Sequence, residues 1–243
     1  MNKILVESDN TVLNKEKYEF TKDDTIYLDV SPSLKKVDLV VLENVKMVIN
    51  LLGRTVNTCI NIHIHKNASL TLNYLLLDSN SNIKIDLDEE KSEFILNYSV
   101  LSNVNSHNQI IVNHNASKTT AILKNHAFSK NCANIILDVS AYIGKKMNKC
   151  ISKQDNQIIE NENSLSQINP NLYIENYDID ASHAAYVGEF KEAELFYLMS
   201  RGLTEESSKL LLLKSFLIGS FNLDENKQEE YYQEVIKYLN KEV

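Results

Sequence analysis

Histidine and cysteine are the side chains of this 243-residue sequence with the chemistry to bind a metal or to carry a proton. His183 stands in a short polar stretch that we expect to be a turn, and its imidazole, which titrates near neutral pH, is a candidate ligand or proton carrier. A plainer interpretation is that His183 only hydrogen-bonds its own turn. His63 and His65 stand two residues apart on an expected strand, so they share a face as two metal ligands would. Two imidazoles are too few for a metal site, which favours surface or turn positions for this pair.

The three cysteines, Cys59, Cys132 and Cys150, are odd in number and widely spaced. This spacing argues against a disulfide framework and against a zinc knuckle, and it favours buried thiols. No phosphate-binding loop, nucleophile elbow or HExxH zinc motif occurs in the sequence. We therefore expect a protein that is not an enzyme and that does not itself bind ATP through a Walker motif.

Charge and hydropathy argue against two kinds of partner. The formal net charge is -8 and no basic cluster that could neutralise phosphates is present, so nucleic acid is not expected. No apolar run approaches the roughly 18 residues of a membrane span. The N-terminal sequence MNKILVESDN also lacks the apolar core of a signal peptide. The expected location is cytoplasmic, with no membrane partner.

Period-two alternation of apolar and polar residues predicts strands through much of the chain. It is clearest at residues 58–65, 69–74 and 82–87. Glycine and proline are scarce, with five and two residues, so asparagine, aspartate and serine must supply the turns. Short strands of this kind allow a sandwich, a barrel or a coiled solenoid, and the pattern alone does not choose among them.

Helix-period patterns occupy the C-terminal part of the sequence. One predicted helix covers residues 191–201 and ends at Gly202, where a chain can enter the left-handed region at little cost. Thr204 is the expected N-cap of a second helix, which runs to about residue 221. A last helix over 222–243, with Asn222 in the capping position, is expected to pack on the other two. The apolar residues of the second helix cover more than one core-facing stripe, which predicts two partners; they are Leu210, Leu211, Leu212, Leu213, Phe216, Leu217, Ile218 and Phe221.

A series of short motifs follows in order through residues 170–221. They are Pro170, Leu172 and Ile174; Asp178, Ser182, His183 and Gly188; Phe196, Tyr197, Leu198, Ser200, Arg201, Gly202 and Leu203; and Glu205 and Glu206 before a leucine run. This series resembles the C-terminal region of the SufB/SufD family, the scaffold proteins of the SUF iron–sulfur cluster assembly system. Members of that family carry a P-x-L-x-I strand, a D-x-x-x-S-H turn, a helix of the form E-x-x-x-F-Y-L-x-S-R-G-[IL], and an acidic, leucine-rich helix.

The resemblance implies a mainly β fold, a right-handed parallel β-helix (solenoid) followed by a small C-terminal α-helical region. The implied boundaries are residues 1–180 for the β-helix core and 181–243 for the helical region. The likeness covers about residues 35–221 and is strongest from residue 148 onward. Family members usually carry a longer helical N-terminal region than this sequence has.

The Ser182–His183 sequence is similar to the SufD branch, because SufB members more often read L-E-H-E-A there. In the SufD branch the matching histidine lies at the contact with SufB. The resemblance therefore implies a cluster-assembly interface that includes Ser182, His183 and Asp155, with His183 as the metal ligand. SufB members keep a functional cysteine at the position that aligns with Asp155, and Cys150 lies five residues earlier. Because clusters prefer thiolate ligands, this chain is expected to complete a shared site and to hold no tightly bound cofactor, only a transient iron–sulfur cluster at a subunit interface.

The two helices after Gly188 correspond, in the family, to the dock of SufC, an ABC-type ATPase. The residues implied in that contact are Phe196, Tyr197, Arg201, Gly202, Leu212 and Phe216. Packing of the same helices within the chain is the competing interpretation. The mechanism that the resemblance implies is that ATP-driven association of two SufC subunits shifts the paired scaffold cores and opens the interface at His183.

Three functions remain open from the sequence. The first is a SufD-like scaffold subunit that pairs with a SufB-like subunit and with SufC. The second is a self-paired, homodimeric SufB/SufD-type scaffold. The third is a non-catalytic β-solenoid interaction module that has kept the fold and lost the chemistry, which the short N-terminal region and Asp155 favour.

Overall fold

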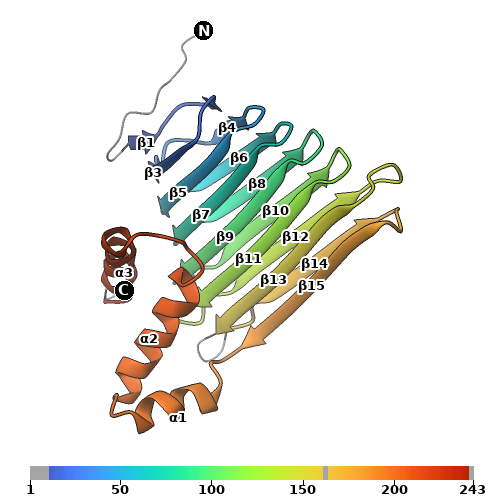
Figure 1. Cartoon of the computed structure of the whole chain (residues 1–243). Helices are drawn as coiled ribbons and strands as arrows, with labels where there is room; N and C mark the ends of the chain where they lie inside the picture. Colours follow the sequence, from blue (N-terminus) through green and yellow to red (C-terminus); the bar gives the residue numbers. More distant parts are fainter. Residues whose placement is uncertain (1–10, 161–163, 241–243) are drawn as a thin grey trace.

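The strands of this chain coil into a parallel β-helix (Figure 1), in a computed structural model that describes residues 11–160 and 164–240. Sheet A contains, in spatial order, β1 (Thr11–Leu13), β3 (Asp24–Val30), β5 (Lys46–Arg54), β7 (Ser69–Leu77), β9 (Glu93–Ser102), β11 (Thr120–Ser129), β13 (Cys150–Glu160) and β15 (Ile179–Gly188). Sheet B contains β2 (Lys17–Phe20), β4 (Lys36–Val41), β6 (Asn57–Ile64), β8 (Asn80–Leu87), β10 (Ser106–His114), β12 (Ile135–Ile143) and β14 (Gln167–Ile174).

Every pair of neighbouring strands in the described residues is parallel. Each strand therefore pairs with the strand two places along the chain, which is the connectivity of a solenoid and not of a sandwich or an up-and-down barrel. The prediction of a parallel β-helix followed by a small helical region is confirmed. The period-two segments at 58–65, 69–74 and 82–87 correspond to β6, β7 and β8.

Stacked inward-facing side chains form the core of the solenoid. Along β6, half-buried and exposed residues alternate with buried ones, as the pleat of a strand requires. In sheet A, Ile49, Leu72 and Leu96 occupy one register position in successive coils, and all three are fully buried. Burial of each such side chain stabilises the fold by roughly 1.5–3 kcal/mol.

Turn residues with positive φ mark the corners between coils. Asn44, Asn67, Asp78 and Asn131 all have the left-handed conformation, which asparagine and aspartate adopt more readily than other residues with a side chain. The expectation that these residue types replace glycine in the turns holds at these corners. Apart from Gly202, lysine, threonine and cysteine occupy the remaining positions with positive φ in the described residues.

Three helices follow the last described strand: α1 (Glu192–Ser200), α2 (Glu205–Ile218) and α3 (Glu225–Leu239). Gly202, with φ 95, and Thr204, whose side chain accepts from the Ser207 amide, separate the first two as predicted. The prediction of Asn222 as a cap is wrong, because Asp224 caps α3 by accepting from the Lys227 amide. Within the described residues, none of the helices has the length and apolarity to cross a membrane.

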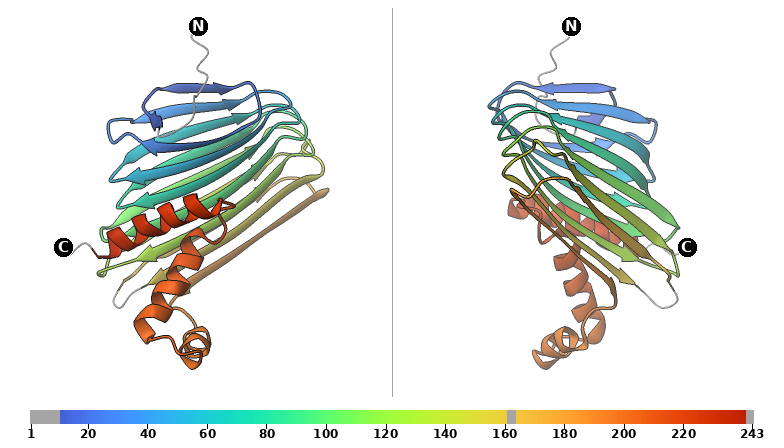
Figure 2. Two further views of the ribbon diagram at one scale, coloured as in Figure 1. Left: turned by 60° about the vertical axis from the view of Figure 1, so that its left-hand side comes forward. Right: turned by 90° about the vertical axis from the view of Figure 1, so that its right-hand side faces the viewer.

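Helix α3 and the C-terminal part of α2 lie on the outer face of sheet A (Figure 2). Tyr231, Val235 and Tyr238 of α3 are buried in one cluster with outward-facing leucines of sheet A and with the end of α2; the sheet residues are Leu52, Leu75, Leu77 and Leu101. The expectation that the last helix packs on the other helices is therefore incomplete. Sheet A supplies much of the contact surface of α3, because the leucines on the outer face of the sheet must be buried against another element.

A ladder of buried asparagines crosses sheet A and offers a test of how the coils are joined. Asn73 Nδ2 donates to Asn50 Oδ1 over 2.7 Å, and Asn97 Nδ2 donates to Asn73 Oδ1 over 2.8 Å. Replacing Asn73 with alanine leaves an acceptor and a donor without partners. We expect the free energy of unfolding in urea to fall by about 2–4 kcal/mol.

A control for the ladder variant is Asn82 of β8, an exposed residue whose amide donates to Gln109. The Asn82→Ala change is expected to cost less than about 1 kcal/mol, because water can replace the lost partner. Equal losses of stability in the two variants would contradict the role of burial in the ladder.

Candidate functional site

The C-terminal end of the solenoid is open in the described part of the chain. β14 and β15 are the last strands of their sheets, so each has a strand neighbour on one side alone. Most residues of β15 are exposed, whereas β13, one coil earlier, alternates buried residues with less buried ones. An unpaired, exposed strand edge is a template for pairing with another chain. β15 runs to Gly188 and α1 begins at Glu192, so the solenoid includes Ser182 and His183.

His183 lies within β15, so the expectation that it stands in a turn is wrong. It is in register with Gln154 of β13, which is 3% exposed and faces the inside of the solenoid. Because neighbours in register share a face, His183 lies on the inward side and is exposed where the end is open. Ser182 and Asp155, which were expected beside it, lie on the outward side, where Asp155 accepts from the Gln157 amide over 3.0 Å. The structure therefore separates His183 from the other two predicted interface residues.

Buried amides line the inside of the last coils next to His183. Asn125 Nδ2 donates to Asn156 Oδ1 over 2.8 Å, and Asn156 Nδ2 donates to the carbonyl oxygen of Ala184 over 3.0 Å. Gln154 Nε2 makes a longer contact of 3.4 Å with the Asn171 carbonyl. Leucine occupies the position of Gln154 in β7, β9 and β11, so this position changes from apolar to polar toward the open end. His183 therefore borders polar groups that can hydrogen-bond to an imidazole or to a polar ligand.

No complete metal site exists in residues 11–160 and 164–240, because no three His, Cys, Asp or Glu side chains are placed to hold an ion. His183 offers one imidazole. A metal or cluster at His183 would need further ligands beyond the described His, Cys, Asp and Glu side chains.

The cysteines do not converge on His183. Cys150 is fully buried at the inward start of β13, and Thr119 Oγ1 lies 3.3 Å from its sulfur. Cys59 is half-buried and Cys132 is exposed. The interpretation of all three as buried thiols therefore holds only for Cys150.

The thiol of Cys150 shares its corner of the solenoid with a buried imidazole. His114 Nδ1 lies 2.7 Å from Thr119 Oγ1, and His114 Nε2 has no hydrogen-bond partner. Burial lowers the pKa of His114 to about 4. The imidazole is therefore neutral in the folded protein at physiological pH.

The lowered pKa predicts acid sensitivity. Between pH 6.5, the value for an exposed histidine, and about 4, the unfolded chain binds a proton at His114 that the folded chain does not. The free energy of unfolding is therefore expected to fall by about 3 kcal/mol as the pH drops through this window. Urea denaturation at pH 7 and pH 4 measures this fall in the free energy of unfolding. In a His114→Gln variant, the fall between the two pH values should be smaller by about 3 kcal/mol. Identical pH dependence in the two proteins would contradict the assignment.

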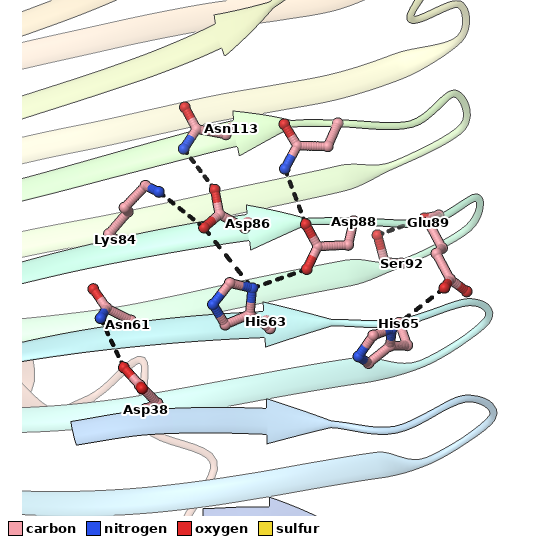
Figure 3. A network of polar contacts seen from close by, with 11 residues as sticks. Asp38, Asn61, His63, His65, Lys84, Asp86, Asp88, Glu89, Ser92 and Asn113 are labelled. Atoms are coloured by element: carbon pink, nitrogen blue, oxygen red, sulfur yellow. Dashed lines mark hydrogen bonds and ion pairs between the residues drawn. The ribbon is translucent and has the colours of Figure 1, made fainter. Parts of the chain in front are cut away.

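His63 and His65 belong to a surface network on the outer face of sheet B (Figure 3). His63 Nδ1 lies 2.9 Å from Asp88 Oδ2 and 3.9 Å from Asp86 Oδ2. Lys84 Nζ lies 3.1 Å from Asp86 Oδ2. His63 and His65 each contact carboxylates of the next coil, which agrees with the interpretation of both as surface residues, and Lys84 shares the Asp86 carboxylate with His63.

Helices α1 and α2 together, residues 192–218, form a helical arm that carries an apolar surface. No residue of α1 is buried, Phe196 is 74% exposed and Tyr197 is 58% exposed. Arg201 lies over the Tyr197 ring at 5.3 Å, so these two side chains form one surface. Other large apolar residues of the same region are also exposed; they are Met199, Leu203 and Leu211. A patch of this kind is typical of a surface that binds another protein.

Leu212 and Phe216, predicted as docking residues, lie on the inner side of the helical arm. The Phe216 ring stacks on His126 of β11 with 4.4 Å between centroids. Leu212 and Phe216 line a hollow against the sheet together with Tyr186. Leu213, Leu217 and Ile218 of α2 are buried against sheet A and α3, and Leu212 and Phe216 lie beside them, so the second partner of α2 stays a prediction.

Sequence reasoning missed two residues that hold the helical arm, Ser99 and His126. Ser99 Oγ donates to the Leu217 carbonyl and His126 Nδ1 contacts the Phe216 carbonyl. No local motif marks either residue. The feature that could identify them is the strand register, because it places Ser99 of β9 beside His126 of β11 on the outward face.

Comparisons with known proteins agree on one family. The profile of the SufBD core domain of the SUF system for FeS cluster assembly matches residues 55–216. The iron–sulfur cluster assembly protein SufD of Bacillus subtilis is 33% identical over 102 residues, which are 42% of this chain and 23% of that protein. SufBD family proteins of Staphylococcus haemolyticus and Staphylococcus aureus are 31% identical over 106 residues, 43% of this chain. The matched stretch spans 23% of the length of each of these relatives.

Proposed function

Because the chain belongs to the SufBD core family of the SUF iron–sulfur cluster assembly system, we propose that it is a non-enzymatic, SufD-like scaffold subunit of that system. In this role it binds an ABC-type ATPase of the SufC kind through its helical arm and pairs with a second scaffold subunit through the open end of the solenoid. The site of action is the cytoplasm. The cluster under assembly is cargo, held transiently between subunits.

The exposed surface of the helical arm is the observation that carries this proposal. Phe196 and Tyr197 lie on α1, which has no buried residue, and Arg201 directly follows it. These side chains are therefore not needed for the packing of the described chain. Aromatic residues and arginine are the types that contribute most to protein–protein binding. The surface thus supports a protein partner, and the family supports the choice of the ATPase.

The open end of the solenoid supports the second contact. β15 offers an unpaired strand edge, and His183 lies on its inward side next to buried amides. A second subunit that covers this edge would bring its own side chains toward His183. The single imidazole would then become part of a shared ligand set for iron or sulfur.

Co-purification tests the proposal. This chain is expressed with the SufC-type ATPase of the same organism, with and without a SufB-like subunit. A stable complex with the ATPase is the expected result. Failure of the ATPase to bind under both conditions would overturn the scaffold role and leave a β-solenoid interaction module with another partner.

Composition of the complex then separates the two scaffold arrangements. A complex that contains one copy of this chain and one SufB-like subunit supports the SufD-like role. A complex that contains two copies of this chain and the ATPase, formed without any SufB-like subunit, supports the self-paired scaffold instead.

A further inference from the structure

The last turn of α2 is fastened to sheet A by two side chains. Ser99 Oγ donates to the Leu217 carbonyl over 2.5 Å, and His126 Nδ1 lies 2.6 Å from the Phe216 carbonyl. A carbonyl can only accept, so the imidazole carries its proton on Nδ1 and donates it. The last four carbonyls of an α-helix have no partner within the helix, and the sheet satisfies two of them here.

Ring contacts strengthen the same attachment. The imidazole of His126 lies over the Phe216 ring with an interplanar angle of 14°. Phe190, in the segment that leads from β15 to α1, meets Phe216 edge to face at 6.0 Å. His126 is in register with Ser99 on the next strand, so both donors come from one position of the sheet in neighbouring coils.

Contact of the helical arm with the sheet also involves Leu213, Leu217 and Ile218, which are buried with leucines of sheet A. A hollow of about 450 Å³ lies between α2 and the last coils, lined in part by Gln157, Tyr186 and Leu212. A second hollow of about 300 Å³, lined in part by Phe128 and Leu213, also borders Phe190. Figure 1 shows α1 projecting beyond the end of the solenoid. Contact with the sheet is therefore concentrated at the C-terminal end of α2.

We propose that Ser99 and His126 are positioning residues that form a latch, and that the helical arm pivots on the solenoid about this latch. The two hollows that border Phe190 give the arm room to move toward sheet A. This inference rests on the proposed function in one respect: if the arm binds an ATPase, the latch is the point at which movement of that partner reaches β9 and β11.

Two substitutions of His126 separate its donor from its ring. His126→Asn keeps an N–H donor at about the position of Nδ1 and loses the stacked ring. His126→Phe keeps a ring against Phe216 and loses the donor. Ser99→Ala removes the other donor with little change in volume. This variant tests the latch even if the histidine variants fail to fold.

Amide hydrogen exchange on the isolated chain is the measurement, followed by mass spectrometry of peptides from the helical arm and from β7. We expect exchange in the arm to accelerate about tenfold in His126→Phe and in Ser99→Ala, as for loss of one hydrogen bond. Exchange in β7, in the core of the solenoid, should stay unchanged. His126→Asn should restore slow exchange in the arm.

Three outcomes would overturn the latch. One is unchanged exchange in the arm of both His126→Phe and Ser99→Ala. Another is equal acceleration in His126→Asn and His126→Phe, which would assign the attachment to ring stacking. The third is acceleration in β7 as large as in the arm, which would make both residues general contributors to stability. No ATPase takes part, so failure here is distinct from failure of the proposed function.

Discussion

Replacing Phe196 with aspartate is expected to abolish co-purification of the SufC-type ATPase with this chain. Phe196 is the most exposed large apolar side chain of the helical arm, and α1 has no buried residue that the change could disturb. In a complex, the new carboxylate would be desolvated against an apolar partner surface without a counter-charge. Loss of one aromatic anchor costs about 2–4 kcal/mol, and the buried charge adds to it, so affinity should fall by more than about 100-fold.

A matched control for this variant is Val104, another exposed apolar residue, which lies between β9 and β10 and outside the helical arm. Val104→Asp should bind the ATPase as the unchanged protein does. Circular dichroism should give the same folded signal for both variants, since neither residue is in the core. If Phe196→Asp binds the ATPase with unchanged affinity, α1 is not part of the docking surface.

The fold was predictable in its local parts more than in its assembly. Alternation marks the strands because each strand buries one face, and that signal is local. Pairing between strands is not local, and the coils vary in length. Asn50 and Asn73 are joined across 23 residues, whereas Asn125 and Asn156 are joined across 31. A sequence without a fixed repeat cannot reveal by its own pattern which strands are neighbours, and family resemblance was needed to choose the solenoid.

For the candidate site, too, the sequence predicted which residues to consider but not where their side chains lie. Motifs drew attention to His183 and to Phe196, but the side of the strand or helix on which each lies depends on register and packing. Asp155 and His183 are close in the fold yet lie on opposite faces, because Asp155 is in register with Ala184. Phe216 is apolar on a helix with two apolar faces, and only the position of His126 shows which face the sheet uses. Contacts between residues 90 positions apart leave no local pattern.

The inward position of His183 leads to the prediction with the most direct bearing on cluster assembly. His183→Ala is expected to lower the yield of iron–sulfur clusters in cells that depend on this protein by about tenfold or more, the scale of loss when a group that tunes a metal site is removed. Binding of the ATPase should not change, because the helical arm does not include β15. Activity of a cluster-dependent enzyme in such cells is the measurement.

Ser182 is the matched control, because it is the neighbour of His183 on the same exposed strand and lies on the opposite face. Ser182→Ala keeps the strand edge and should leave cluster yield unchanged. If both variants lower the yield, pairing of β15 with a second subunit is what the changes disturb, and the imidazole has no separate role. Normal yield in His183→Ala would contradict the shared site, since β15 carries no other imidazole and the buried thiol of Cys150 lies at the start of β13, four register positions from the partner of His183.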